Sequence, residues 1–393
     1  GLTLDTRKPH PTPGDHVEQP TSGAATHGCT AHPRPDLGSS PRRRREHTGS
    51  MTAAAPNPDD ELFHPVGDHP AWSESYYFNF VDPATGVGAF TRMGFRPNEG
   101  WADALHAVYL PGGRVAFTYG RRTDLTPEVV AGLGPVDPQV ANLTLRRGEA
   151  FTRWDIVYSG EAQDMDDPTV MLAATKDRPE GWHRPAQLEM DVAFEAISDP
   201  HYAVGGAQGH FEQTGRVHGT IRLDDQQWDV QGFGVRDKSW GPRTWQAPSG
   251  SAAKEAGPKV ADTGCFINWF SMNFGAELAL GGTCGRTADG TFRGKGWIQR
   301  DGRNLDLDDV TMTTVFDPNE PLLHQTVQLR GTDSEGTPIV VDGTVLTICP
   351  TKVPRRDGVT FINEGLARFE TDAPDGSRLT GFGISEHWHA VAR

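Results

Sequence analysis

The sequence predicts an all-β protein, and three observations support this fold class. The 393 residues include 46 Gly and 30 Pro, a frequency of turn-forming residues too high for a helical bundle. Segments of alternating apolar and polar residues recur at a spacing of roughly 8 to 12 residues, with turn signals between them. They give roughly eight strands on each side of a Ser-, Ala- and Gly-rich segment at residues 246–260, a rhythm typical of sandwiches and barrels.

The first 50 residues are expected to lie outside the fold. They contain no Phe, Trp or Tyr, and they include the run Arg42–Arg45. Such a segment cannot bury enough apolar surface to offset the entropy lost on ordering it. No apolar stretch follows the arginines, so no export signal is expected, and Met51 looks like an ordinary start of translation. We predict a disordered extension over residues 1–59, an N-terminal β domain over 60–245 and a C-terminal β domain over 246–393.

The strands of the N-terminal part are expected at residues 74–80, 87–95, 104–110, 114–119, 142–146, 151–158, 187–197, 209–217, 219–223 and 227–235. Pro111-Gly112-Gly113 is typical of a hairpin turn, and only Thr126–Leu133 has the pattern of a short helix. The strands of the C-terminal part are expected at residues 265–274, 276–282, 291–299, 304–315, 325–330, 338–348, 364–371 and 378–386.

Each half carries a Gly-x-Gly strand near its end, at Gly232–Gly234 and Gly381–Gly383. Two such strands fit close turning at the corner of a barrel. The alternative is a chance match in a glycine-rich chain.

Charge and composition exclude several classes of function. With 37 basic and 52 acidic residues the formal charge is −15, which argues against a nucleic-acid binder or a protein that binds anionic membranes. No apolar run reaches the roughly 20 residues of a membrane-spanning helix. The four cysteines form no Cys-x-x-Cys pair and no zinc-binding spacing, so we expect reduced thiols in a cytoplasmic protein. No nucleotide-binding fingerprint is present, and we predict neither a cofactor nor a metal.

One segment carries most of the candidate chemistry. Residues 231–243 place three cations, the carboxylate of Asp237 and the indole of Trp240 at the end of a predicted strand, with Trp245 two residues further on. A strand end is where a rigid scaffold presents polar groups to a cavity. Upstream, alternation puts His210 and Glu212 on one strand face, while Phe211 and Gln213 share the other.

The stretches 209–213 and 232–243 resemble the lipocalin-like superfamily of carotenoid 1,2-hydratases and AttH-type proteins, most closely an uncharacterised actinobacterial branch. The resemblance covers about residues 60–393. It implies two lipocalin-like antiparallel β-barrels in tandem, or strongly curved sheets, packed together around an apolar ligand pocket in or between them. In carotenoid hydratases the matching turn reads Tyr-His-Asp-His-Asn-Trp-Gly, and its aspartate is the proposed proton donor.

Asp237, Trp240 and Gly241 match this turn, and His210 lies where those enzymes have an essential histidine. Val235, Arg236 and Glu212 depart from the pattern, which argues against a carotenoid substrate.

The candidate catalytic residues are therefore Asp237 as the acid, with His210 and Glu212 as its polar partners. The candidate ligand-binding residues are Arg236, Trp240, Arg243, Trp245 and Trp269. To protonate an alkene near neutral pH, Asp237 needs a pKa raised by burial. Strand alternation turns Arg236 to the opposite face, where it can reach a different carboxylate. The alternative role of Asp237 is structural, as an ion-pair partner of Arg243 that stabilises the turn.

Two classes of function follow. The first is a cofactor-independent hydratase, isomerase or cyclase that acts on an apolar terpenoid, steroid, fatty-acyl or polyketide molecule held in a β-barrel pocket. The second is a carrier that binds such a molecule without changing it; only an acid catalyst needs a titrating site. No protein partner is indicated.

Two further pairs of residues are expected to lie at the protein surface without a catalytic or metal-binding role. Glu364 and Glu386 could serve as acids, but carboxylates are usually exposed, and we expect them at the surface. His387 and His389 have a spacing that metals use, but without a third ligand nearby we expect them to be exposed to solvent.

Overall fold

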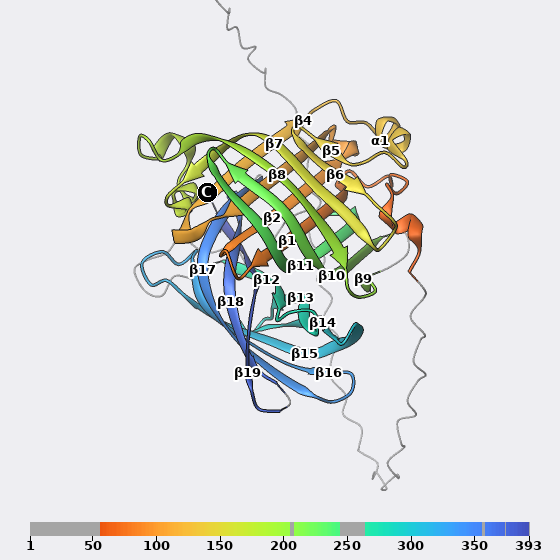
Figure 1. Ribbon diagram of the computed structural model, residues 1–393. Helices are drawn as coiled ribbons and strands as arrows, with labels where there is room; N and C mark the ends of the chain where they lie inside the picture. The colour runs from red at the N-terminus through yellow and green to blue at the C-terminus, as the bar shows by residue number, and fades with distance from the viewer. Residues whose placement is uncertain (1–55, 205–207, 244–263, 356–357, 374, 393) are drawn as a thin grey trace, which may run out of the picture. The chain divides into compact units, whose positions relative to one another are not determined.

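The computed structural model describes residues 56–204, 208–243, 264–355, 358–373 and 375–392 (Figure 1). Residues 55–393 form one compact unit. Within the described residues, strands dominate, and they form a large antiparallel sheet followed by a closed eight-stranded barrel. The predicted all-β class, with two strongly curved sheets in tandem, is confirmed.

The large sheet has eleven strands: β1 (Trp72–Asp82), β2 (Val87–Arg96), β3 (Trp101–Tyr109), β4 (Val115–Arg122), β5 (Gln139–Val140), β6 (Leu143–Arg147), β7 (Arg153–Met165), β8 (Arg184–Ala196), β9 (His201–Val204), β10 (Gly209–Leu223) and β11 (Gln226–Pro242). Their order is β4-β3-β2-β1-β11-β10-β8-β7-β6-β5, with β9 paired to β10. β4 also pairs with β7 through residues 115–117, so the sheet curls back on itself.

The closed barrel follows in simple chain order: β12 (Cys265–Asn273), β13 (Leu278–Arg286), β14 (Phe292–Arg300), β15 (Arg303–Phe316), β16 (His324–Asp333), β17 (Pro338–Arg355), β18 (Gly358–Asp372) and β19 (Arg378–Ala392). Every neighbouring pair is antiparallel, and β19 closes the barrel against β12. The predicted linker at residues 246–260 lies outside the described residues, and the domain boundaries at 60–245 and 246–393 stay a prediction.

Helices are short. α1 (Pro127–Leu133) forms where the sequence predicted it, because Thr126 caps its first turn and Pro127 suits the first helical position. The remaining described helices are the 3-10 turns η1 (Pro58–Glu61), η2 (Pro97–Glu99), η3 (Pro111–Gly113), η4 (Pro168–Leu172) and η5 (Thr175–Asp177). η1 begins before the predicted domain start at residue 60. No helix in the described ranges is both long and apolar enough to cross a membrane.

Strand β1 is buried on both faces, because one face packs into the core of the curved sheet and the other faces the barrel. Tyr76 and Phe78 point into the core of the curved sheet, whereas Tyr77 points to the other side and packs with residues of the barrel. The Tyr77 hydroxyl donates a 2.9 Å hydrogen bond to Oε2 of Glu364 in β18, and the Tyr109 hydroxyl donates a 2.8 Å bond to the Glu364 carbonyl. Every residue of β1 is buried, the polar ones included, as expected for a strand that is covered on both sides.

The two Gly-x-Gly strands are explained by close approach. A Cβ on Gly234 of β11 would lie 1.8 Å from the carbonyl oxygen of Asn79 in β1, and one on Gly383 of β19 would lie 2.0 Å from that of Ser271 in β12. Both pairs join the last strand of a sheet to its first. Only glycine allows the backbones to come so near, so the repeated motif is not a chance match.

The C-terminal histidines are buried, and their predicted exposure was wrong. His387 and His389 have no exposed surface, because β19 is paired on both edges and covered on both faces. The His387 ring stacks on His324 with centroids 3.9 Å apart, and burial lowers the pKa of His387 well below its usual value. Cys265, Cys284 and Cys349 are buried and form no disulfide among the described residues, as expected.

Candidate functional site

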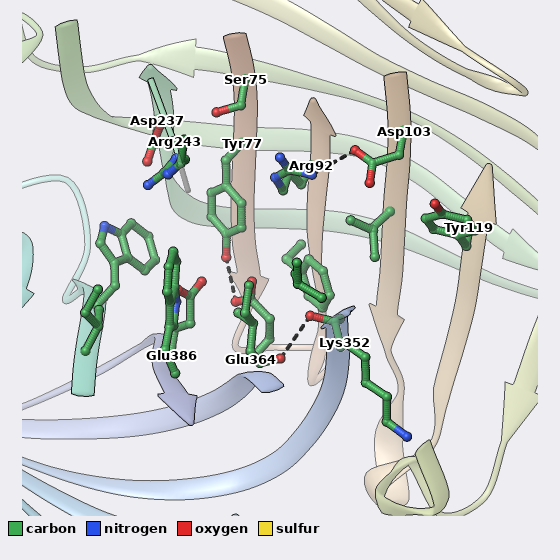
Figure 2. A pocket seen from close by; sticks show the side chains of 18 of the residues that line it. Ser75, Tyr77, Arg92, Asp103, Tyr119, Asp237, Arg243, Lys352, Glu364 and Glu386 are labelled. Carbon is green, nitrogen blue, oxygen red and sulfur yellow. Dashed lines mark hydrogen bonds and ion pairs between the residues drawn. The ribbon is translucent and has the colours of Figure 1, made fainter. Parts of the chain in front are cut away.

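A cavity of about 790 Å³ lies where β1 to β4 of the large sheet face β12, β13 and β17 to β19 of the barrel (Figure 2). It therefore lies between the two curved sheets rather than inside a barrel. Its apolar wall includes Phe90, Leu105, Phe117, Met171, Ile267 and Trp269. Charged side chains from several strands also line it, which is the composition of a ligand site with a few orienting polar groups.

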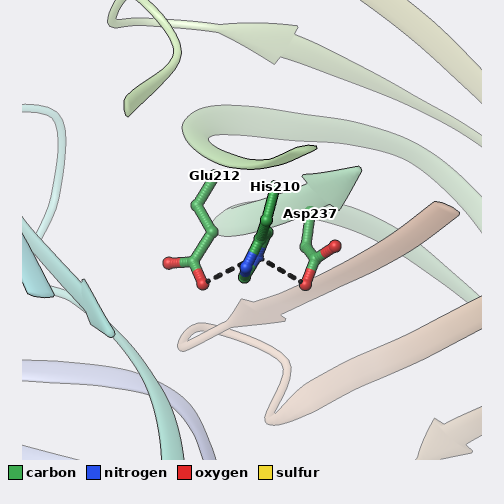
Figure 3. Close-up of side chains that lie close together, drawn as sticks. All are labelled: His210, Glu212 and Asp237. Atoms are coloured by element: carbon green, nitrogen blue, oxygen red, sulfur yellow. Dashed lines mark ion pairs between the residues drawn. The ribbon is translucent and has the colours of Figure 1, made fainter. Parts of the chain in front are cut away.

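His210 and Asp237 line this cavity from the paired strands β10 and β11 (Figure 3). The register places Glu212 directly opposite Asp237, and alternation puts His210 on the same face. Nε2 of His210 lies 3.0 Å from Oδ2 of Asp237 and 3.3 Å from Oε1 of Glu212. The three residues predicted to be catalytic thus form one cluster.

The cluster is charged. Burial alone would lower the pKa of His210, but Asp237 and Glu212 outweigh it and raise that pKa to about 10. Burial would raise the pKa of Asp237, but His210 and Arg243 outweigh it and lower that pKa below its ordinary value. At neutral pH the site therefore holds an imidazolium beside an ionised Asp237, not the protonated carboxyl that alkene protonation by this residue requires.

Glu212 is held by two indoles of the barrel. Trp269 Nε1 donates a 2.7 Å hydrogen bond to Oε1, and Trp297 Nε1 donates a 2.6 Å bond to Oε2. Glu212 is only 4% exposed, so these bonds replace the water it has lost. Trp269, a predicted ligand-binding residue, also lines the cavity, whereas Trp297 was missed by sequence reasoning.

The same cluster is the group of described residues that could hold a metal ion. Ligand atoms of His210, Glu212 and Asp237 all lie within 4.8 Å of one another. Both oxygens of Glu212 already accept indole hydrogen bonds, and His210 already sits between two carboxylates. These contacts are those of an ion-paired imidazolium, although Oδ1 of Asp237 has no hydrogen-bond partner among the described residues, and the prediction of no metal stays a prediction.

A second titratable group faces the cavity from the barrel. Glu364 of β18 and Glu386 of β19 are direct cross-strand partners, 4% and 8% exposed, and both line the cavity. Their carboxyl groups hydrogen-bond each other, Tyr77 donates to Glu364, and the Trp388 indole donates to Glu386. Their predicted surface position was wrong.

Burial raises the pKa of both carboxyl groups, and for Glu364 the charge of Glu386 adds to the rise, to well above its usual range. Two adjacent buried anions repel each other, so this contact favours the protonated form of one of the two carboxyl groups. The pairing of these two glutamates could have been predicted from the sequence. The turn signal Asp375-Gly376 predicts a hairpin, and the hairpin register that pairs Asp372 with Arg378 also pairs Glu364 with Glu386.

Arg236, a predicted ligand-binding residue, does not line the cavity. It is 1% exposed on the opposite face of β11, where Nη1 and Nη2 lie 3.0 and 2.5 Å from the carboxylate oxygens of Glu61. Its Nε donates a 2.7 Å bond to Gln213. Period-two alternation explains the separation, because Asp237 points one way and Arg236 the other.

Of the other residues predicted to bind a ligand, one lines the cavity and one faces away from it. Trp240 faces away from the cavity, with its ring stacked on His64 at 3.8 Å and buried beside Phe211. Arg243 lines the cavity and donates a 3.2 Å bond to the Ser239 hydroxyl. Trp245 lies outside the described residues.

The curved sheet and the closed barrel give this β protein a lipocalin-like fold, and the cavity between them is lined by titratable side chains. The chain belongs to the family described as "Domain of unknown function (DUF7064)", whose model matches residues 57–391. A comparison with curated proteins gave no match.

Solved structures share the fold. A protein described as an AttH from Nitrosomonas europaea is similar with a TM-score of 0.52 and 14% identity, over 86% of this chain and 98% of that chain. Kievitone hydratase from Nectria haematococca gives a TM-score of 0.47 and 10% identity, over 81% of this chain and 89% of that chain. CghA with Sch210972 gives a TM-score of 0.44 and 10% identity, over 82% of this chain and 89% of that chain. At these identities the likeness supports the predicted AttH-type fold and nothing finer; the actinobacterial branch stays a prediction.

Proposed function

We propose that this protein is an acid–base enzyme of the hydratase, isomerase or cyclase type, which acts on a largely apolar molecule with a carbon–carbon double bond. One observation carries the proposal. The buried, mutually hydrogen-bonded carboxyl pair Glu364 and Glu386 and the ion-paired His210 and Asp237 line one cavity with apolar walls. Perturbed titratable groups that converge on a cavity are typical of catalytic sites.

The carboxyl pair is the proton donor in this proposal. Its proton moves to one alkene carbon, so that a C–H bond forms, the π bond breaks, and a cation remains on the substrate beside a carboxylate on the pair. Aromatic faces of Tyr77, Trp269 and Trp388 line the cavity and suit a cationic intermediate. Addition of solvent water, loss of a neighbouring proton or attack by an internal π bond then gives a hydration, an isomerisation or a cyclisation. In each case a proton returns to the pair.

His210 and Asp237 act as fixed charges in this scheme. The ionised Asp237 favours positive charge that develops on the substrate, and His210 holds that carboxylate in place through the 3.0 Å ion pair. The carboxyl pair thus takes the role of acid that the sequence had suggested for Asp237.

The test begins with the bound molecule. Native mass spectrometry with organic extraction, on protein purified from its own host, identifies what the cavity retains. Turnover of that molecule in D₂O then reports carbon-bound deuterium. We expect Glu364→Gln and Glu386→Gln to retain the molecule but to lose about 100-fold or more of the deuterium incorporation. Glu370→Gln, on the same strand but outside the cavity lining, is the matched control. A wild-type protein that binds the molecule and never changes it is a carrier, and the proposal would then be wrong.

A further inference from the structure

The cavity is rich in cations, although the chain is acidic. Five Arg or Lys side chains line it, against four carboxyl side chains, in a protein with a formal charge of −15: Arg92, Arg121, Arg178, Arg243 and Lys352, with Asp103, Asp237, Glu364 and Glu386. The raised pKa of Glu364 reduces the negative charge of the lining, and His210 adds a positive charge. The lining therefore carries a positive excess that the rest of the molecule does not.

Two of these cations lie close together in the cavity lining. Lys352 Nζ donates a 2.6 Å bond to the Ala173 carbonyl and a 2.8 Å bond to the Leu172 carbonyl, and Arg178 Nε donates a 3.4 Å bond to the same Ala173 carbonyl. Both side chains are half-buried. Among the described residues, no carboxylate forms an ion pair with either of them. Besides the carbonyls, Arg178 lies over the Trp182 ring at 4.4 Å and Lys352 over the Phe361 ring at 5.2 Å, so two like charges lie close together with only neutral partners.

This arrangement favours an anion. Burial lowers the pKa of Lys352, and the neighbouring charge of Arg178 lowers it further, because each cation destabilises the other. An ammonium group has three donors and a guanidinium has five, so both side chains keep N–H donors beyond those given to the carbonyls. A carboxylate placed between them would accept charge-assisted hydrogen bonds and relieve the repulsion.

The cation pair is separated from the acid pair by the length of an aliphatic spacer. Along the backbone of β17, Lys352 lies three residues, about 10 Å, from Cys349, which is the cross-strand partner of Glu364. The odd offset starts the Lys352 side chain on the other strand face, but Lys352 and Glu364 both line the cavity. Apolar side chains such as Phe117 and Ile362 line the same cavity.

From this geometry we propose that Arg178 and Lys352 bind the carboxylate of an amphipathic substrate, whose apolar body reaches toward Glu364 and Glu386. The inference rests on the cavity being the substrate site of the proposed enzyme, and it narrows the substrate to molecules with an anionic end.

Binding tests this inference without turnover. Isothermal titration calorimetry compares decanoate, decyl phosphate and decan-1-ol, which share one alkyl chain and differ in the head group. We expect decanoate to bind the wild-type protein about tenfold more tightly than decan-1-ol. Arg178→Gln and Lys352→Gln should each weaken decanoate binding about fivefold to tenfold and leave decan-1-ol unchanged. Lys295→Gln removes the same charge from a highly exposed barrel position outside the cavity lining, and it should change neither.

Three outcomes would overturn the inference: equal affinity for the acid and the alcohol, loss of both ligands in the two variants, or tighter binding of decyl phosphate that depends on the same cations. The last result would assign the site to a phosphate. If a variant fails to fold, the wild-type salt dependence decides, since added NaCl should weaken decanoate binding but not decan-1-ol binding. The binding measurement does not depend on turnover. The anion site and the proposed chemistry can therefore fail separately: a Glu386→Gln variant that is inactive but still binds decanoate more tightly than decan-1-ol retains the anion site.

Discussion

The charged state of His210 is the prediction that most directly tests the site. The pKa of His210 is raised from 6.5 to about 10 by Asp237 and Glu212 against the effect of burial. A shift of this size corresponds to roughly 3 to 5 kcal/mol of stabilisation. Because the pKa is raised on folding, this stabilisation is fully present below the unfolded value of 6.5 and is lost as the pH rises through about 10.

Asp237→Asn removes the nearer of the two carboxylates and leaves Glu212 at 3.3 Å. One opposite charge at this distance accounts for about one to three pKa units. We therefore expect the pKa of His210 to fall by that amount and the free energy of unfolding at pH 7 to decrease by about 2 to 4 kcal/mol. The difference between variant and wild type should shrink toward pH 10, where His210 of the wild type also loses its proton.

The assay combines two measurements. NMR of protein with labelled histidine follows the ring signal from pH 5 to pH 11, and the signal of His210 is the one that disappears in His210→Gln. Guanidinium denaturation gives the free energy of unfolding at pH 7 and pH 10. Asp229→Asn, an exposed aspartate on the same strand, is the control that should change neither quantity. A wild-type His210 that titrates near 6.5 would refute the reasoning.

Three further predictions follow from single contacts. Glu212→Gln leaves an amide facing two indole N–H donors, and we expect a loss of about 2 to 4 kcal/mol in the free energy of unfolding, measured by denaturation; an unchanged midpoint would contradict the bonds. Tyr77→Phe removes the donor to Glu364, so the infrared band of the protonated carboxyl pair should persist to higher pH, and a lower titration would argue against the protonated form of the pair. Gly234→Ala places a methyl group 1.8 Å from a carbonyl oxygen and should cost more than about 2 kcal/mol, whereas Gly285→Ala, with open space around it, should cost under about 1 kcal/mol; equal costs in thermal denaturation would refute the close approach.

The candidate site was only half predictable from the sequence. Strand alternation placed His210 and Glu212 on one face, and it turned Arg236 away toward another carboxylate, which is Glu61. Trp240 was expected to form a cavity wall, but the same alternation turns it into the core beside His64.

The carboxyl pair and the cation pair were not recognised, for different reasons. Glu364 and Glu386 are joined by hairpin register, which a turn signal can suggest, but their burial depends on the sheet that covers them. Arg178 directly follows the short helix η5, whereas Lys352 lies on the distant barrel strand β17. No local sequence pattern relates two such positions.

By itself the sequence determined the all-β class, the strand rhythm, the short helix and which neighbouring residues of a strand share a face. These features depend on periodicity and turn chemistry, which are local properties of the chain. Only the tertiary structure decided that a cavity lies between the curved sheet and the barrel, that Trp269 and Trp297 hold Glu212, and that two buried glutamates meet there with raised pKa values. Alternation tells which face a side chain points to, but burial and pKa depend on what packs against that face, and those partners come from distant parts of the chain.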